Sequence, residues 1–163
     1  MQGRTNLSST ITQFETFINE WRFTRGLSLD LLGALSETDL SYSPGFGMGP
    51  LWKQFRHIGR VQEDYVLALT TGKVSFSTTG KKRFKQEGAD GLRTYLSVCD
   101  EEMLRTLSET PGSFEIDWFG EKVKVSEHMW RLAAHETFHH GQWVIYMHGL
   151  GKPFPPSWSA WGF

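Results

Sequence analysis

Four stretches of the chain carry apolar residues at spacings of three and four, the spacing of one face of an α-helix. In chain order the repeating residues are Ile11, Phe14, Ile18 and Trp21; Leu51, Phe55, Ile58, Tyr65 and Leu69; Leu92, Leu96, Cys99, Met103 and Leu107; and His128, Leu132, His135, His139, Trp143 and Tyr146. Only Gln62 interrupts the second series, whereas histidines occupy core positions of the fourth. The pattern predicts four amphipathic helices of about 20 residues each.

Residues typical of helix ends and turns separate these stretches. Gly, Pro and Ser are concentrated in three linkers, residues 41–50, 70–91 and 110–126. At the helix ends we expect Pro50 in a first turn, Asp90 and Ser126 as N-caps, and Gly149 or Gly151 after the last turn of the fourth helix. Within the third linker, residues 115–125 alternate around a glycine, which predicts a short hairpin before the fourth helix.

Four helices that each carry one apolar face bury those faces most simply against one another. The sequence therefore predicts an all-α four-helix bundle with long crossover linkers. Its 163 residues are a usual size for one domain, so we expect a single domain over residues 1–163. Residues 152–163 hold two Trp and two Phe among their prolines. We expect this aromatic tail to pack over the bundle as a strap rather than to serve as a lid or a dimer contact.

The charge balance and the cysteine content narrow the functional classes. Lys and Arg number 17 against 18 Asp and Glu, for a formal charge of -1, so no overall field attracts nucleic acid or an anionic membrane. The basic run at residues 81–85 is more typical of a solvated turn. The single cysteine, Cys99, cannot form an internal disulfide, and the first residues lack the features of a signal peptide. We expect a cytoplasmic protein without a membrane span, with Cys99 in its core.

Two histidines on the buried stripe of the fourth helix, His135 and His139, need an explanation because packing alone would favour Leu or Ile there. They are four residues apart, so their rings lie about 40° apart around the helix axis. Two buried imidazoles repel each other when charged and compete for partners when neutral, whereas a shared metal ion removes both problems. We therefore favour a metal site over a pair of hydrogen-bonded core histidines.

The stretch that begins at His135 also matches the His-Glu-x-x-His motif of zinc proteases. Those enzymes need a third ligand further along the chain, either Glu or His. No acidic residue follows Glu136 in the sequence, and His148 comes nine residues after His139, about 180° around the helix. We therefore do not expect a protease.

The third ligand must then come from another helix, and His57 is the only histidine outside the region of the fourth helix. It lies on the flank of the second apolar stripe, and we expect it to face inward. Three neutral imidazoles from two facing helices leave coordination positions open for water or substrate, which is typical of a catalytic metal site. Zinc and nickel both accept imidazole, so the ligands do not select between them.

These residues also carry a resemblance to a known family. The stretch AAHETFHHGQWVIYMHGLG, with a histidine inside LWKQFRHIGRVQEDYVLAL, resembles the DinB/YfiT-like superfamily of bacterial four-helix bundles, which is unrelated to the polymerase of that name. The resemblance covers residues 8–151, and its specific part is HETFHHGQ together with the distant histidine. It implies metal ligation by His57, His135 and His139, the three residues already selected by helix geometry.

The resemblance also implies an activity. Some members are S-transferases or isomerases that use low-molecular-weight thiols such as bacillithiol or mycothiol, and others are described as metal-dependent hydrolases. We therefore expect a divalent zinc or nickel ion that activates a thiol or water toward a small electrophile. A homodimer is implied as well, and neither nucleic acid nor a membrane is expected as a partner. The alternatives are a non-catalytic, stress-associated bundle that binds metal and an interaction bundle whose histidines are hydrogen-bonded in its core.

Five other polar residues are weaker candidates for the site. Glu136 points about 100° away from the histidine before it, so we favour a bond to a neighbouring helix over a role as base or ligand-orienting group. His140 is expected to form a hydrogen bond within the bundle, and the role of Gln142 stays open. Asp64 and His128 each lie about 10 Å along a helix from the nearest candidate ligand. That is too far for the ion, although either could line a pocket.

Overall fold

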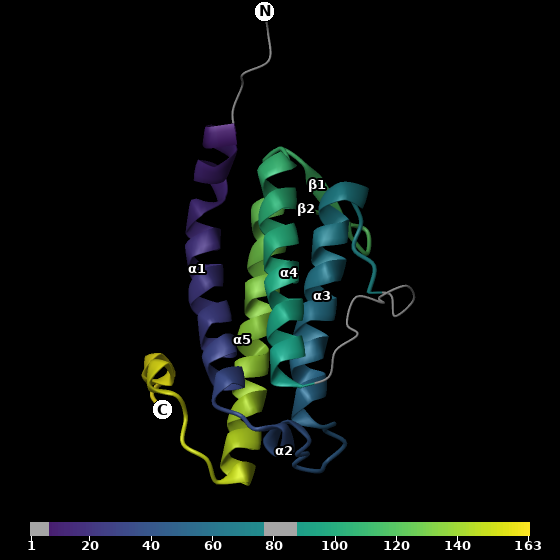
Figure 1. Ribbon diagram of the computed structural model, residues 1–163. Coiled ribbons are helices and arrows are strands. Elements are labelled where there is room, and N and C mark those ends of the chain that lie inside the picture. Colours follow the sequence, from purple (N-terminus) through teal and green to yellow (C-terminus); the bar gives the residue numbers. More distant parts are fainter. Residues whose placement is uncertain (1–6, 77–87) are drawn as a thin grey trace, which may run out of the picture.

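The computed structural model of the chain is a bundle of four long helices (Figure 1). The long helices are α1 (Leu7–Gly33), α3 (Leu51–Thr71), α4 (Ala89–Glu109) and α5 (Val125–Leu150). A short helix, α2 (Glu37–Leu40), joins α1 to α3, and a 3₁₀ helix, η1 (Pro156–Trp161), lies near the C-terminus. The structure describes residues 7–76 and 88–163, with side chains from residue 14 onward; the basic run at residues 81–85 lies outside this part.

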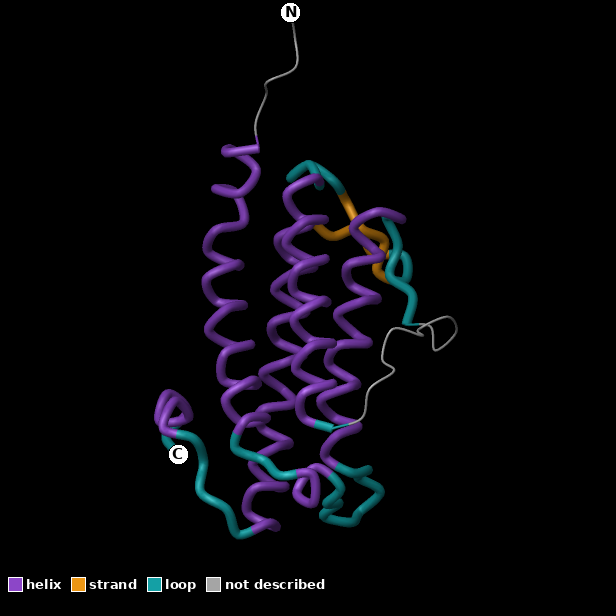
Figure 2. Tube along the Cα trace, in the orientation of Figure 1, coloured by secondary structure: helices purple, strands orange, loops and turns teal. Residues whose placement is uncertain are grey.

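The four helices pack as a closed ring in which α1 and α3 each contact both α4 and α5. The only strands in the described part of the chain lie at one end of the bundle, next to α3 (Figure 2). The all-α prediction is therefore confirmed. None of the described helices combines the length and the apolar character that a membrane span requires.

The predicted hairpin is present between α4 and α5. Strands β1 (Glu115–Trp118) and β2 (Glu121–Lys124) pair antiparallel around a two-residue turn. Both turn residues, Phe119 and Gly120, have positive φ, as a type I′ hairpin turn requires. The facing residues Ile116 and Val123 are buried, so the hairpin covers that end of the core.

Three helix starts differ from the prediction. Helix α3 begins at Leu51, so Pro50 is its N-cap and not a residue of the first turn. Helix α5 already begins at Val125 because strand β2 runs directly into it, and α4 already begins at Ala89. Ser126 and Asp90 are therefore residues of the first turn and not N-caps. At the other end of α5 the predicted glycine is present: Gly151 adopts a left-handed conformation with φ of 64°.

The buried core is divided into two apolar clusters along the bundle, separated by a layer of polar residues. This polar layer takes one charged or amide side chain from each long helix: Arg25, Gln62, Asp100 and Glu136. Arg25 Nη2 lies 2.7 Å from Gln62 Oε1 and 3.0 Å from Glu136 Oε2. Gln62 also donates to Asp100 Oδ1 at 2.9 Å. The residue that interrupts the apolar stripe of α3 is therefore a bridge between helices.

The aromatic tail, residues 152–163, packs against α1 and α5 (Figure 1). Trp158 is fully buried, and its indole Nε1 donates to the carbonyl oxygen of Leu27 at 3.0 Å. Trp161 Nε1 donates to His140 Nδ1 at 3.2 Å. At the start of the tail, Lys152 forms an ion pair with Asp39 of α2. These contacts tie the tail to three elements of the bundle.

Candidate metal centre

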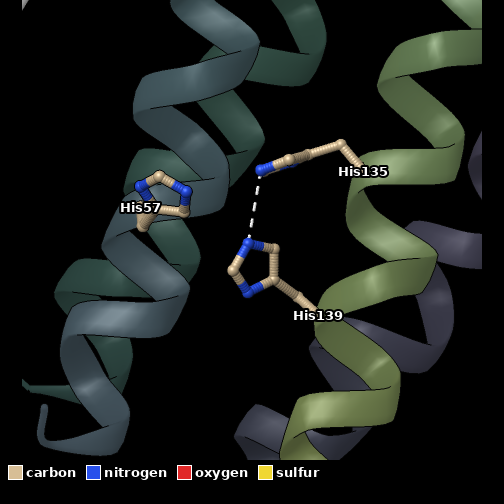
Figure 3. A group of neighbouring side chains, drawn as sticks. All are labelled: His57, His135 and His139. Atoms are coloured by element: carbon tan, nitrogen blue, oxygen red, sulfur yellow. Dashed lines mark hydrogen bonds between the residues drawn. The ribbon is translucent and has the colours of Figure 1, made fainter. Parts of the chain in front are cut away.

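The three histidines selected from the sequence come together between α3 and α5 (Figure 3). His135 and His139 project from successive turns of α5, and His57 faces them from α3. The His57 ring centroid lies 5.3 Å from that of His135 and 5.0 Å from that of His139. One nitrogen from each ring lies within 4.8 Å of the other two. Within the described residues this is the only group of three or more His, Cys, Asp or Glu side chains close enough to share an ion.

The surroundings of the three rings differ. His139 is buried and His135 half-buried, but His57 is exposed, so the expectation that His57 faces inward was wrong. It lies on the edge of α3, one position before the buried Ile58, and reaches across toward α5 rather than into the core. The trio is therefore closed on the core side and open toward solvent.

Burial keeps the two α5 imidazoles neutral. It lowers the pKa of His135 to about 4, with His57 adding to the effect. It lowers the pKa of His139 to about 3, and the neighbouring His135 and His57 act in the same direction. A neutral imidazole has a free lone pair, which is the form that binds a metal ion.

The arrangement of the nitrogens fits a divalent ion. The Nε2 atoms of His135 and His139 face each other at 3.3 Å. Two nitrogens of a tetrahedral zinc site, each about 2.0–2.1 Å from the ion, lie about 3.3 Å apart, so this pair already has the separation of two ligands. The opposite ring nitrogen of His139, Nδ1, is buried without a hydrogen-bond partner among the described residues. Three neutral nitrogen donors suit zinc or nickel better than calcium or magnesium, which prefer oxygen.

Gln142, one turn after His139 on α5, lies close to the His139 ring. Its amide favours the protonated form of that ring, although no hydrogen bond of good geometry reaches Nδ1. Residues in this position fix the orientation of a ligating imidazole in many metal sites. The sequence left the role of Gln142 open, and its interaction with His139 makes it a candidate for a residue that orients this ring.

Glu136 does not face the three histidines. It is 1% exposed and points toward α1, where Arg25 pairs with one carboxylate oxygen and Ser28 donates to the other at 2.6 Å. Burial raises the pKa of Glu136, while Arg25 and Ser28 act against this rise. The preference for a bond to a neighbouring helix is thus confirmed. His140, the next residue on this face, contacts Ser28 Oγ at 2.8 Å, as expected for a histidine bonded within the bundle.

The remaining weaker candidates have other surroundings. Asp64 is buried on α3 and is not part of the three-histidine group. Cys99 is buried, and burial raises the pKa of its thiol to about 12, which makes it a core residue and not a nucleophile. His148 is exposed and contacts the rings of Phe154 and Phe163 in the tail.

A pocket of about 290 Å³ opens beside His57. It is lined by Gly49, Lys53, Gln54, Arg56, His57 and Arg60. Burial and the charge of Arg60 lower the pKa of Arg56. A larger pocket of about 480 Å³ lies between the end of α1, Arg93 and the tail. No histidine is among the described residues that line it. The smaller pocket is therefore the one that adjoins the candidate ligands.

Burial keeps two further histidines neutral, and their hydrogen bonds fix which ring nitrogen carries the proton. Trp118 Nε1 donates to His128 Nδ1 at 2.9 Å, so the proton of that ring lies on Nε2, 2.9 Å from the carbonyl oxygen of Tyr65. Trp161 fixes the same tautomer in His140. Burial lowers the pKa of each ring to about 4.

We expect the stability of the fold to decrease as the pH falls from about 6.5 to about 4. In this window the unfolded chain binds protons at His128 and His140 and the folded chain does not, which costs about 3 kcal/mol per histidine by pH 4. Above pH 6.5 both states carry neutral rings and the effect vanishes. Denaturant unfolding of the wild type and of His128→Gln across this range measures it, because Gln can retain both hydrogen bonds without titrating. Equal pH dependence in the two proteins would contradict the assignment.

Comparison with known proteins agrees with this fold. The model of the DinB family matches residues 1–159 of the chain. The structure is similar to the crystal structure of a DinB-like protein, YjoA, from Bacillus subtilis, with a TM-score of 0.70 and 17% sequence identity, covering 86% of this chain and 96% of that chain. At this identity the likeness shows a shared fold only. No curated protein matches the sequence. Because the family match spans nearly the whole chain and agrees with the helical bundle, this chain belongs to the DinB family.

Proposed function

We propose that this protein is a metal-dependent enzyme that uses a divalent ion, zinc or nickel, on His57, His135 and His139 to activate a thiol or a water molecule toward a small electrophile. The observation that supports this most is the convergence of three imidazoles from two helices at a position that is open to solvent and adjoins a pocket. Three ligands with an open side are typical of catalytic metal sites, whereas structural sites are closed by a fourth ligand.

The histidines would keep the full charge of the ion available, because all three are neutral ligands. When bound, the ion would lower the pKa of a thiol or water held at the open side and so supply a nucleophile near neutral pH. His135 and His139 hold their side of the centre within the bundle, and His57 holds the side toward the pocket.

The lining of the centre favours a thiol over water. The one carboxylate of the His-Glu-x-x-His stretch, Glu136, is turned toward α1, and the described residues that line the pocket include no acidic side chain. No carboxylate is therefore available as a general base among the described residues that line the pocket. A thiol, with an ordinary pKa of about 8.5, needs far less help to ionise than water does. An S-transferase that takes a low-molecular-weight thiol is thus the first choice, and a hydrolase the second.

Metal analysis of the full-length, untagged protein tests the proposal. We expect about one zinc or nickel ion per chain after reconstitution, in keeping with one three-ligand site. After cobalt substitution, addition of a small thiol such as cysteine or glutathione is expected to produce the absorption of a thiolate-to-cobalt bond. Metal-dependent consumption of the thiol with a small electrophile would establish turnover. One ion per chain without thiol binding or turnover would favour the non-catalytic bundle, and absence of metal after reconstitution would overturn the proposal.

A further inference from the structure

The pocket beside His57 is lined by three cationic side chains from consecutive turns of α3. Lys53, Arg56 and Arg60 are three and four residues apart, so they lie on one face of the helix, the same face that carries His57. The other lining residues, Gly49 and Gln54, are uncharged. No acidic side chain is among the lining residues in the part of the chain that the structure describes.

Two of these cations are supported by an aromatic ring. The guanidinium carbon of Arg56 lies 4.6 Å from the ring centroid of Trp52, and the ammonium nitrogen of Lys53 lies 5.6 Å from the same centroid. A cation–π contact orients a cationic group but leaves its charge in place, whereas a carboxylate would cancel it. Both groups line the pocket, and the ring leaves their positive charge uncancelled.

The cations are also close enough to act on one another. Lys53 and Arg56 lie one turn apart on α3 and line the same pocket. Two like charges on one side of a pocket repel each other, and a ligand of opposite charge would relieve this repulsion. Arginine donates two parallel hydrogen bonds to carboxylate or phosphate oxygens, and Lys53 and Gln54 can donate further ones.

We propose that this pocket binds an oxyanion group of the substrate, a carboxylate or a phosphate, while the reactive end of the same molecule reaches the three histidines. His57 lines the pocket and also belongs to the histidine group, so one small molecule can span both sites. The volume of about 290 Å³ suits a small molecule or one end of a larger one. The inference rests on the proposed function for the link to catalysis, but anion binding itself can be measured without metal.

The experiment titrates the full-length protein with succinate and, separately, with inorganic phosphate at constant ionic strength. Calorimetry measures binding to the chelator-treated and to the zinc-loaded protein, and succinamide serves as the uncharged analogue of succinate. The pocket variants are Arg56→Gln and Lys53→Gln. The matched control is Arg105→Gln, an exposed arginine of α4 that pairs with Glu109. Thermal unfolding confirms that each variant is folded.

Binding of succinate or phosphate to the metal-free protein, without binding of succinamide, is the expected result. Arg56→Gln is expected to weaken it about 10- to 100-fold, the usual range for loss of a charge-assisted hydrogen bond, whereas Arg105→Gln leaves it unchanged. The anion that binds more tightly shows whether the pocket recognises a carboxylate or a phosphate group. The inference is overturned if the protein binds zinc but neither anion, or if Arg56→Gln binds the anion as tightly as the wild type does. In either case the metal proposal still stands. Anion binding without metal binding has the opposite meaning: it supports the pocket and refutes the metal centre.

Discussion

Replacement of His139 by alanine is expected to lower the affinity for the divalent ion at least about 100-fold, because the remaining two ligands come from different helices and give an incomplete site. An ion present at 1,000 times its dissociation constant, and bound only by the folded state, stabilises a protein by about 4 kcal/mol. For a chain of this length that gain raises Tm by about 8–16 °C. The variant is expected to lose this rise, which metal analysis and thermal unfolding with and without chelator measure.

The matched control for this prediction is His148→Ala. His148 lies on the same helix but is exposed and contacts only aromatic rings of the tail among the interactions described above. This variant should retain one ion per chain and the full metal-dependent rise in Tm. Cooperative unfolding of metal-free His139→Ala would show that the fold survives. If His139→Ala keeps its ion, the three-histidine centre is wrong.

Replacement of Glu136 by glutamine is expected to destabilise the fold by about 3 kcal/mol and to lower Tm by about 6–12 °C. Arg25 and Glu136 are 3% and 1% exposed, so the variant leaves a buried guanidinium without its nearest carboxylate. Breaking such a pair usually costs about 3–5 kcal/mol. We expect the lower end because Asp100 Oδ1 remains 3.4 Å from Arg25 Nε. Denaturant unfolding at pH 7 measures the difference.

A double-mutant cycle with Arg25→Met separates the ion pair from other effects. The double variant should be less destabilised than the sum of the two single variants, because it leaves no buried charge unpaired. Metal content provides the second readout. A base or ligand at Glu136, as in the zinc proteases, predicts lost activity with an intact fold, whereas the structure predicts lost stability with the ion retained. Unchanged stability of Glu136→Gln would contradict the role assigned to the polar layer.

Helix periodicity was sufficient to predict the four long helices, because the residues that face the core repeat locally within each helix. The hairpin was predictable for a similar reason, since its alternation and its turn glycine are neighbours in sequence. The proximity of His57 to His135 and His139 could be predicted by elimination, because only one histidine lies outside the region of α5. The bundle brings α3, which carries it, into contact with α5.

The polar layer and the neighbouring contact of Ser28 with His140 were not predicted, although some of these residues left signals in the sequence. Arg25 and Ser28 continue the stripe of α1 after Trp21, and Gln62 interrupts the stripe of α3. Each signal indicates a buried polar group but not its partner. The partners are 37 residues apart for Arg25 and Gln62 and 112 residues apart for Ser28 and His140. Which of these groups meet depends on the order of helices around the bundle, and helix periodicity does not carry that information.

The exposure of His57 was also not predictable from spacing. A residue on the flank of an apolar stripe can turn toward the core or along its edge, and the neighbouring helix decides which. Here α5 brings its own histidines to that edge, so His57 reaches them without entering the core.

Helix α5 carries two pairs of residues that are offset by one position. His135 and His139 face α3, while Glu136 and His140 face α1 and the tail. In the proposed function the first pair serves chemistry, while the contacts of the second pair serve folding, so the two roles are free to evolve at different rates. A lineage that exchanges the first pair for apolar residues would lose the proposed metal centre and keep its bundle, whereas a change in the second pair would destabilise the whole bundle. In this helix, new chemistry can therefore be acquired or abandoned without rebuilding the protein around it.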